Sequence, residues 1–114
     1  MSGVTEVALF TDDVENGVSF YRLLLGVEPA AAWPGGAVFA SGDVKLLVHD
    51  RGAGMGDGPP NEDHVAIGVS DLDGRCDELR SAGHSLLVEP RSYPWGRSAY
   101  LRDPDGRLVE LTQE

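Results

Sequence analysis

The feature that most constrains this chain is an internal repeat. The stretch EVALFTDDV at 6–14 recurs as HVAIGVSDL at 64–72, with apolar residues in the same alternating places and an Asp before the last of them. Later in each half, GDVKLLV at 42–48 lies over GRLVELT at 106–112. Two matches in the same order indicate a duplicated architecture, in which each half is one supersecondary unit.

Hydrophobic periodicity divides the first half into one helix and four strands. Residues 4–11 alternate as a strand does, and Asp12 and Asp13 can cap a helix that Gly26 ends. Three further strands are expected, separated by Gly-containing turns, at 27–32, 37–40 and 44–49. The first half is therefore predicted to have the order βαβββ.

The second half repeats that order. Its expected elements are a strand at 64–70, a helix from Asp71 to Gly83, and strands at 85–88, 98–102 and 108–112. The run DPDG at 103–106 is typical of a tight turn, because Pro presets φ and Gly accepts a positive φ.

The Gly/Pro-rich stretch RGAGMGDGPPNED, 51–63, has no periodicity and is the expected linker. We predict a single α+β domain over 1–114, in which a first βαβββ unit (1–50) and a second (64–114) flank that linker.

Charge limits the partners. Nineteen acids against nine Lys plus Arg give the 114-residue chain a net charge of −10. This disfavours nucleic acid and anionic membrane surfaces, which need a basic face, and it allows a cationic ligand. The single cysteine, Cys76, permits no intrachain disulfide, and neither a signal peptide nor an apolar run of ~20 residues is present. A cytoplasmic location is expected.

Side-chain alternation assigns residues to the two faces of each set of strands. One helix per unit covers one face, so the other face is available for a ligand. On the first strand the apolar Val7 and Leu9 should face the helix, which places Glu6 on the opposite face. The repeat places His64 on the same face as Glu6, and alternation along the last strand places Glu110 there too.

Glu6, His64 and Glu110 form a candidate metal-ligand set. Two carboxylates brought together repel unless a proton or a cation intervenes. Oxygen ligands with one imidazole suit Mn²⁺, Fe²⁺, Co²⁺, Ni²⁺, Zn²⁺ or Mg²⁺, and three protein ligands leave positions for water or substrate. The alternative is that the three are ordinary solvated or Arg-paired side chains. His49 and His84 are expected at the surface.

Several stretches resemble the vicinal oxygen chelate superfamily of glyoxalases, bleomycin-resistance proteins and extradiol dioxygenases. They are PWGRSAYLRDPDGRLVEL, the openings EVALFTDDV and HVAIGVSDLD, and the helix FYRLLLG. The resemblance covers nearly the whole chain. It implies paired βαβββ units that curl into a cup-shaped mixed sheet with the helices on the outer face, a metal in the cup, and usually a homodimer.

The resemblance also implies where ligands should lie, namely on the first and last strand of each unit. The matching positions are Glu6, His64, Glu110 and, by alignment with Glu110, Leu46. Glu6 stands where His or Gln is more usual, and Leu46 cannot bind a metal. This departure argues against lactoylglutathione lyase activity in particular.

Two functions follow. The first is a divalent-metal-dependent enzyme of lyase, isomerase or dioxygenase type, in which the metal acts as a Lewis acid on a small oxygenated substrate. No catalytic residue is assigned; the expected pocket residues, of which the two Trp could equally be packing residues, are Phe10, Tyr100, Trp33 and Trp95. The alternative is a metal-free, bleomycin-resistance-like homodimer that sequesters a cationic small molecule.

Overall fold

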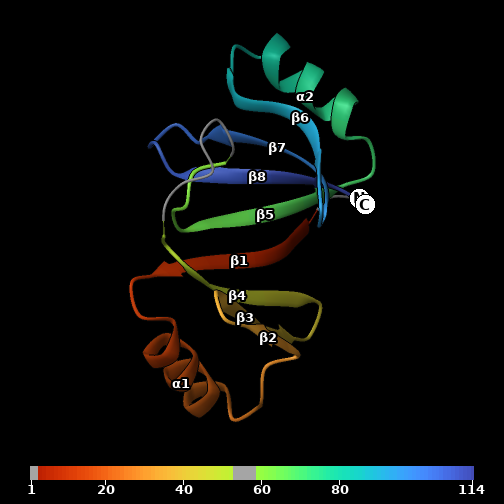
Figure 1. Ribbon diagram of the computed structural model, residues 1–114. Helices are drawn as coiled ribbons and strands as arrows, with labels where there is room; N and C mark the ends of the chain where they lie inside the picture. Colours follow the sequence, from red (N-terminus) through yellow and green to blue (C-terminus); the bar gives the residue numbers. More distant parts are fainter. Residues whose placement is uncertain (1–2, 53–58) are drawn as a thin grey trace. The chain divides into compact units, whose positions relative to one another are not determined.

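The computed structural model describes residues 3–52 and 59–114 (Figure 1). The elements follow the order β1 α1 β2 β3 β4, then β5 α2 β6 β7 β8, which confirms the two predicted βαβββ units. Part of the expected linker, 53–58, lies outside the described residues. The chain forms an N-terminal unit, Glu6–Asp63, and a C-terminal unit, His64–Glu114 with Met1–Thr5.

The N-terminal unit places its strands in the order β2-β3-β4-β1, with β1 parallel to β4 and the other pairs antiparallel. Its elements are β1 (Gly3–Thr11), α1 (Val14–Leu25), β2 (Ala31–Trp33), β3 (Gly36–Ser41) and β4 (Val44–Asp50). The strand expected at 27–32 is shorter, because Pro29 has no N–H to donate and pairing begins only at Ala31.

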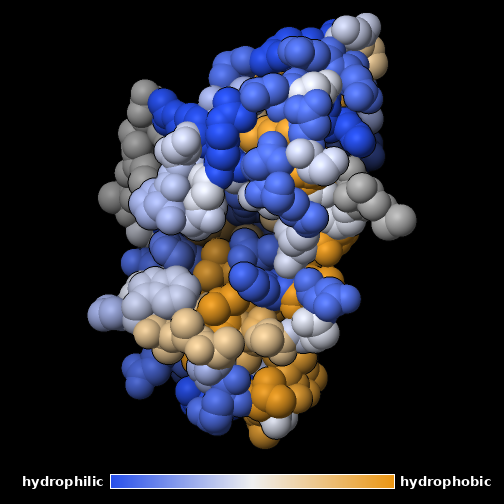
Figure 2. Space-filling view, turned by 90° about the vertical axis from the view of Figure 1, so that its right-hand side faces the viewer, coloured by the Kyte–Doolittle hydropathy of each residue, from blue (hydrophilic) through white to orange (hydrophobic). Residues whose placement is uncertain are grey.

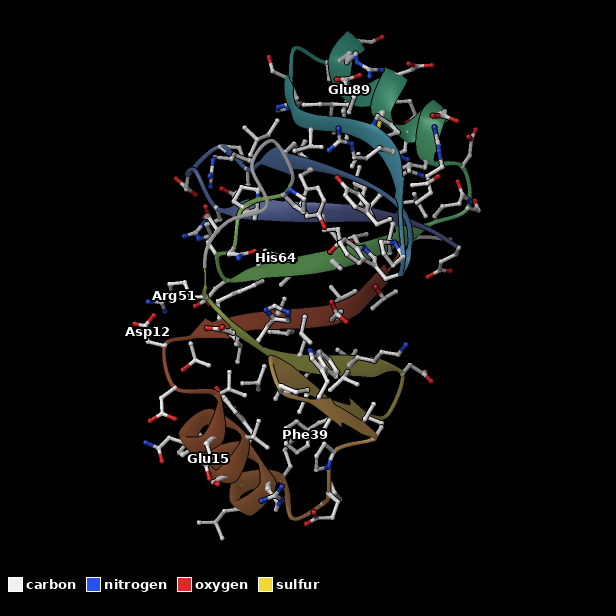
Figure 3. The ribbon with its side chains drawn as sticks, in the orientation of Figure 1. Asp12, Glu15, Phe39, Arg51, His64 and Glu89 are labelled. Carbon is white, nitrogen blue, oxygen red and sulfur yellow. The ribbon has the colours of Figure 1, made fainter. Side chains whose placement is uncertain are left out.

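Helix α1 packs against β3 and β4. Asp13 caps its start by accepting from the Asn16 N–H at 3.1 Å, and Gly26 ends it in the left-handed conformation, as predicted. A Cβ on Gly17 would lie 3.2 Å from the Val48 side chain, so this glycine permits the close approach of helix and strand. The wholly buried Phe39 extends from β3 on the same side (Figure 3).

The C-terminal unit repeats this arrangement in the order β5-β8-β7-β6, with β5 parallel to β8. Its elements are β5 (His64–Val69), α2 (Leu72–Ser81), β6 (Leu86–Tyr93), β7 (Gly96–Arg102) and β8 (Leu108–Gln113). Helix α2 packs on β6, β7 and β8. The buried core between helix and strands consists of Val69, Leu72, Cys76, Ala99, Leu101 and Leu111.

Two element boundaries in this unit differ from the sequence prediction. Helix α2 is capped by Asp71, as expected, but Ala82 ends it and Gly83 follows with φ 96°. Strand β6 continues past 88 to Tyr93 and contains Pro90. Proline is tolerated because β6 pairs only with β7 in this unit and its register shifts near that point.

The turn at 103–106 is held as its sequence predicts. The carboxylate of Asp103 accepts from the backbone N–H of Asp105 at 3.0 Å and of Arg107 at 2.8 Å. Gly106 takes a φ of 88°. The backbone donation from Arg107, with the guanidinium of that residue and the Asp105 N–H, lowers the pKa of Asp103. The turn therefore fixes where β8 begins.

Strand register defines two faces in each unit, the helix face and, opposite the helix, the distal face. In the C-terminal unit Ala66, Glu110 and Tyr100 lie side by side on the distal face. In the N-terminal unit Ala8 and Leu47 lie side by side on the corresponding face. These assignments confirm the predicted faces of Glu6, His64 and Glu110 within their own units, because alternation along a strand is strict.

The register corrects the predicted counterpart of Glu110. Ala8 and Ala66 hold the same place in the repeat, and their partners are Leu47 and Glu110. The counterpart is therefore Leu47, whereas Leu46 lies opposite Val7 on the helix face. The predicted alignment placed Gly42 over Gly106, the glycines of the two turns. It was one residue out of register, because the β7–β8 turn is longer than the β3–β4 turn. Leu47, like Leu46, cannot bind a metal.

Candidate functional site

A buried polar network lies on the distal face of the C-terminal unit. His64, the first residue of β5 (Figure 3), places Nε2 3.2 Å from Oε1 of Glu110, and the two side chains are only 6% and 7% exposed. The hydroxyl of Ser98 donates to the other carboxylate oxygen of Glu110 at 2.8 Å. Ser98 and Glu110 are the buried polar residues of the described chain. The predicted pair His64 and Glu110 is thus brought together.

This environment keeps Glu110 ionised. Burial alone would raise the pKa of its carboxyl group. Hydrogen bonds from His64 and Ser98, the charge of His64 and a hydrogen bond from Tyr100 outweigh burial, and the pKa lies below its ordinary value. A carboxylate held in this way is prepared to bind a cation.

His64 and Glu110 fit a divalent metal as two of its ligands. Two donor atoms that each lie about 2.1 Å from one ion are about 3.0 to 3.4 Å apart at octahedral or tetrahedral angles. The 3.2 Å between His64 Nε2 and Glu110 Oε1 falls in this range. Ser98 and Tyr100 orient the carboxylate from behind, as hydrogen-bonding partners of metal ligands do. Across 3–52 and 59–114, no group of three or more His, Cys, Asp or Glu side chains is placed so that it could hold a metal ion.

Aromatic rings extend from this pair. Tyr100 lies edge-on to His64, with ring centroids 5.9 Å apart, and Tyr93 lies edge-on to Tyr100 at 6.3 Å. Trp95 stacks on Tyr93 at 4.5 Å, with the rings nearly parallel, and is 53% exposed. The predicted pocket residues Tyr100 and Trp95 therefore belong to one aromatic row.

Tyr93 lies between Tyr100 and Trp95 in this row and was not predicted from the sequence. Its hydroxyl oxygen is buried and has no hydrogen-bond partner among the described residues. A buried unpaired hydroxyl is costly and suggests that a water or ligand atom completes it. The position could have been found only by extending β6 beyond Pro90.

The distal face of the N-terminal unit carries Glu6 and a separate aromatic group. Glu6 lies opposite Lys45 in the β1–β4 pair. Phe10 and Trp33, both expected in the pocket, lie near the ring of His49, at centroid distances of 5.5 and 6.3 Å. Glu6 belongs to a different unit from His64 and Glu110, so its share in a metal site stays a prediction.

His49 differs from its expected surface position, because it is half-buried beside two aromatic rings. Its Nδ1 lies 2.8 Å from the carbonyl oxygen of Asp50, and donation there leaves Nε2 of the neutral ring as an acceptor. The signal that could have found it is its alternation with Leu47 on β4, which places it on the distal face. His84 is exposed, as expected.

Residues 3–111 match the model of the Glyoxalase/Bleomycin resistance protein/Dioxygenase superfamily, and the chain belongs to this family. The resemblance seen in the sequence is thereby confirmed. In the described residues, no helix is both long and apolar enough to cross a membrane.

The individual relatives share less than a third of their residues with this chain. A probable lactoylglutathione lyase of Synechocystis is 29% identical over 114 residues, covering 89% of this chain and 87% of its own. The glutathione transferase FosA of Serratia marcescens is 29% identical over 115 residues, covering 97% and 80%. A superfamily member from Vibrio splendidus shares the fold with a TM-score of 0.76, at 19% identity and full coverage of both chains. Methylmalonyl-CoA epimerase from Mycobacterium tuberculosis does so with a TM-score of 0.76, at 22% identity, covering 97% and 87%.

Proposed function

We propose that this protein is a divalent-metal-dependent enzyme that acts on a small oxygenated substrate. The observation that carries the proposal is the buried, hydrogen-bonded pair of His64 and Glu110 on a sheet face opposite the helix. A buried carboxylate–imidazole pair is costly without a function. His64 Nε2 and Glu110 Oε1 are also spaced as two ligands of one ion would be. Glu6 is the third proposed ligand, on the strength of the repeat alone.

The metal, when bound, would supply Lewis-acid stabilisation of an oxyanion on the substrate. The chain's own residues do the rest. Ser98 and Tyr100 keep the Glu110 carboxylate ionised and oriented. Tyr100 fixes the plane of the His64 ring by edge-on contact. The proposed pocket walls are Phe10, Trp33, Tyr100 and Trp95.

The reaction type is left open among lyase, isomerase and dioxygenase chemistry. Leu47, at the place that corresponds to Glu110, offers no ligand atom. For this reason we do not propose lactoylglutathione lyase activity, although some relatives carry that name. A cytoplasmic location, supported by a single buried cysteine, Cys76, belongs to the same proposal.

A second function is favoured by charge. The chain carries a net charge of −10, and Trp95 exposes more than half of its surface on a stacked pair with Tyr93. An acidic surface with exposed aromatic rings suits a cationic small molecule, which a metal-free homodimer could sequester without chemistry. The buried ligand-type pair has no use in such a binder, which is why the enzyme is preferred.

Metal analysis separates the two functions. The protein is purified without a metal-affinity tag and its metal content is measured, together with that of His64→Ala and Glu110→Ala. His84→Ala is the matched control, because His84 is exposed and lies outside the pair. Stoichiometric metal in the wild type and the control, lost in both pair variants, supports the enzyme. Absence of metal, with a melting temperature unchanged by Mn²⁺, Ni²⁺ or Zn²⁺, would sink it.

A further inference from the structure

Strand β6 brings a cation onto the distal face of the C-terminal unit. Arg91 lies opposite Ser98 in the register of β6 and β7, and the hydroxyl of Ser98 donates to Glu110 on the distal face. Residues that lie opposite each other on paired strands point to the same side of a sheet, so Arg91 lies on that face too. Its guanidinium carbon is 5.9 Å from the centroid of the Tyr93 ring, over which it lies. A positive charge is therefore held on the face that carries the pair of His64 and Glu110.

What distinguishes Arg91 is its face, because an exposed arginine is ordinary in itself. Figure 2 shows mainly hydrophilic surface at the level of α2. There Arg80 pairs with Asp77 of its own helix and with Glu89 of β6, so these charges belong to the helix face. Arg91 is exposed on the opposite face, in a chain of net charge −10 that would otherwise repel an anion.

The position of Arg91 suits a ligand that also reaches the proposed metal ligands. Only β7 lies between β6, which carries Arg91, and β8, which carries Glu110. Opposite residues have Cβ atoms ~5 Å apart, and the hydroxyl of Ser98, which lies opposite Arg91, is 2.8 Å from the Glu110 carboxylate. A molecule of a few carbon atoms with an oxygen group at each end can therefore span the guanidinium and the carboxylate–imidazole pair.

Tyr93 offers a second donor at the same place. Its buried hydroxyl has no hydrogen-bond partner among the described residues, and a ligand that brings an acceptor oxygen would satisfy it. The guanidinium of Arg91 has five N–H donors in a planar fork, which matches a carboxylate or a phosphate alongside its other contacts. Both side chains therefore favour a ligand group that is rich in acceptor oxygens and negatively charged.

We propose that Arg91, with the Tyr93 hydroxyl, binds an anionic group of the substrate, a carboxylate or a phosphate that is separate from the oxygens directed to the metal. This assignment rests on the proposed function and adds the class of substrate to it. Arg91 determines specificity here: it contacts the substrate and takes no part in holding the metal. The same guanidinium would repel a cationic ligand, so anion binding at this place also counts against the cation-sequestering alternative.

Isothermal titration calorimetry with three α-hydroxy acids tests the assignment. Lactate, malate and 3-phosphoglycerate offer the same hydroxyl and carboxylate oxygens to a metal, but only malate and 3-phosphoglycerate carry a further anionic group. Each is titrated into the full chain with and without Mn²⁺, after the metal content has been measured. The variant is Arg91→Gln, and the matched control is Arg75→Gln, which removes the same charge from an exposed arginine of α2.

We expect the wild type and Arg75→Gln to bind malate or 3-phosphoglycerate at least about tenfold more tightly than lactate, because a charge-assisted pair with a guanidinium adds to chelation. In Arg91→Gln this advantage should disappear, while lactate affinity and metal content stay unchanged. Tyr93→Phe should lower the affinity for the preferred anion by about fivefold, the effect of one hydrogen bond. Which of the two anions is preferred identifies the substrate group as a carboxylate or a phosphate.

The outcomes separate this assignment from the metal centre. Equal affinities for all three acids in a metal-loaded wild type overturn the anion site and leave the metal centre intact. An equal loss in Arg91→Gln and Arg75→Gln also overturns it, because net charge alone would then explain the preference. A wild type that takes up no metal refutes the proposed function instead, and metal-independent malate binding that Arg91→Gln abolishes would still support the anion site.

Discussion

The two βαβββ units share one architecture and carry opposite chemistry on corresponding strands. Register pairs each distal-face residue of one unit with its counterpart in the other. The C-terminal unit has His64, Ser98, Tyr100 and Glu110 where the N-terminal unit has Glu6, Gly36, Val38 and Leu47. A polar network that holds a carboxylate ionised therefore exists in one unit, and its counterpart is almost entirely apolar.

The outer sides of the helices show the reverse. Helix α2 presents charged residues outward and buries Leu72 and Cys76, whereas α1 buries no residue fully and exposes leucines. Both helices keep an Asp N-cap and the same place in the order of elements. The comparison teaches that the two units share one element order and strand register, while corresponding surfaces carry different side chains. Substitutions that copy one unit into the other can test this.

The largest expected effect comes from Glu110→Leu, which copies Leu47 into the C-terminal unit. It removes one proposed ligand and leaves the Ser98 hydroxyl without its acceptor. We expect metal affinity, measured by isothermal titration calorimetry with Zn²⁺ or Mn²⁺, to fall by at least about 100-fold. Glu78→Leu on the exposed side of α2 is the control and should leave affinity unchanged. Equal affinity in both variants would contradict the metal centre.

Next in size is a pair of substitutions that tests the corrected register. Leu46→Glu places a carboxylate between the strands and α1, where Val7 and Phe39 are its neighbours. We expect a loss of about 2 kcal/mol in the free energy of unfolding, since a charge on this half-buried side chain would lie among apolar neighbours. Leu47→Glu, on the distal face, should cost clearly less. Urea denaturation measures both, and the opposite order would restore Leu46 as the counterpart of Glu110.

Most of the fold could be predicted from the sequence, because its signals are local. The period of two along 6–10 and 64–67 assigned Glu6 and His64 to their faces, and Asp13, Asp71 and Gly26 marked helix ends. The counterpart of Glu110 was wrong, because register depends on the number of residues in a turn and not on the similarity of its glycines.

Two residues, Tyr93 and His49, were not placed correctly from the sequence. Tyr93 lies on β6 beyond Pro90, a residue that normally ends a strand but is tolerated where one side of the strand is unpaired in its unit. His49 was expected at the surface because it nearly ends a strand, yet two rings from different strands enclose it. Alternation with Leu47 places His49 on the distal face, but the rings that half-bury it come from strands far apart in the sequence.

A smaller effect is expected from Ser98→Ala, which makes this position as apolar as its counterpart Gly36. The pKa of Glu110 should rise, because one of the hydrogen bonds that offset burial is lost. A carboxylate binds metal only when ionised, so affinity is retained above the pKa of Glu110 and lost as the pH falls through it. The loss should therefore begin at a higher pH in Ser98→Ala than in the wild type.

Calorimetric metal titrations at a series of pH values check this, and affinity near neutral pH should fall by about tenfold. Thr112→Ala is the control, because Thr112 lies opposite Ser98 across β7 and β8, whereas it is the Ser98 hydroxyl that donates to Glu110. A pH profile that is the same in wild type and Ser98→Ala would show that the serine does not support the carboxylate.

The smallest effect should be the same in both units, because the N-caps of the two helices are alike. Asp13 and Asp71 take nearly identical backbone angles, φ −139° and −137° with ψ 87° in both, and each accepts from the N–H three residues ahead at 3.1 Å. Asp13→Ala and Asp71→Ala should each lower the free energy of unfolding by about 1 kcal/mol. Chemical denaturation of the two variants measures this. A difference well above the error would mean that the helices, and not only their outer sides, contribute unequally to stability.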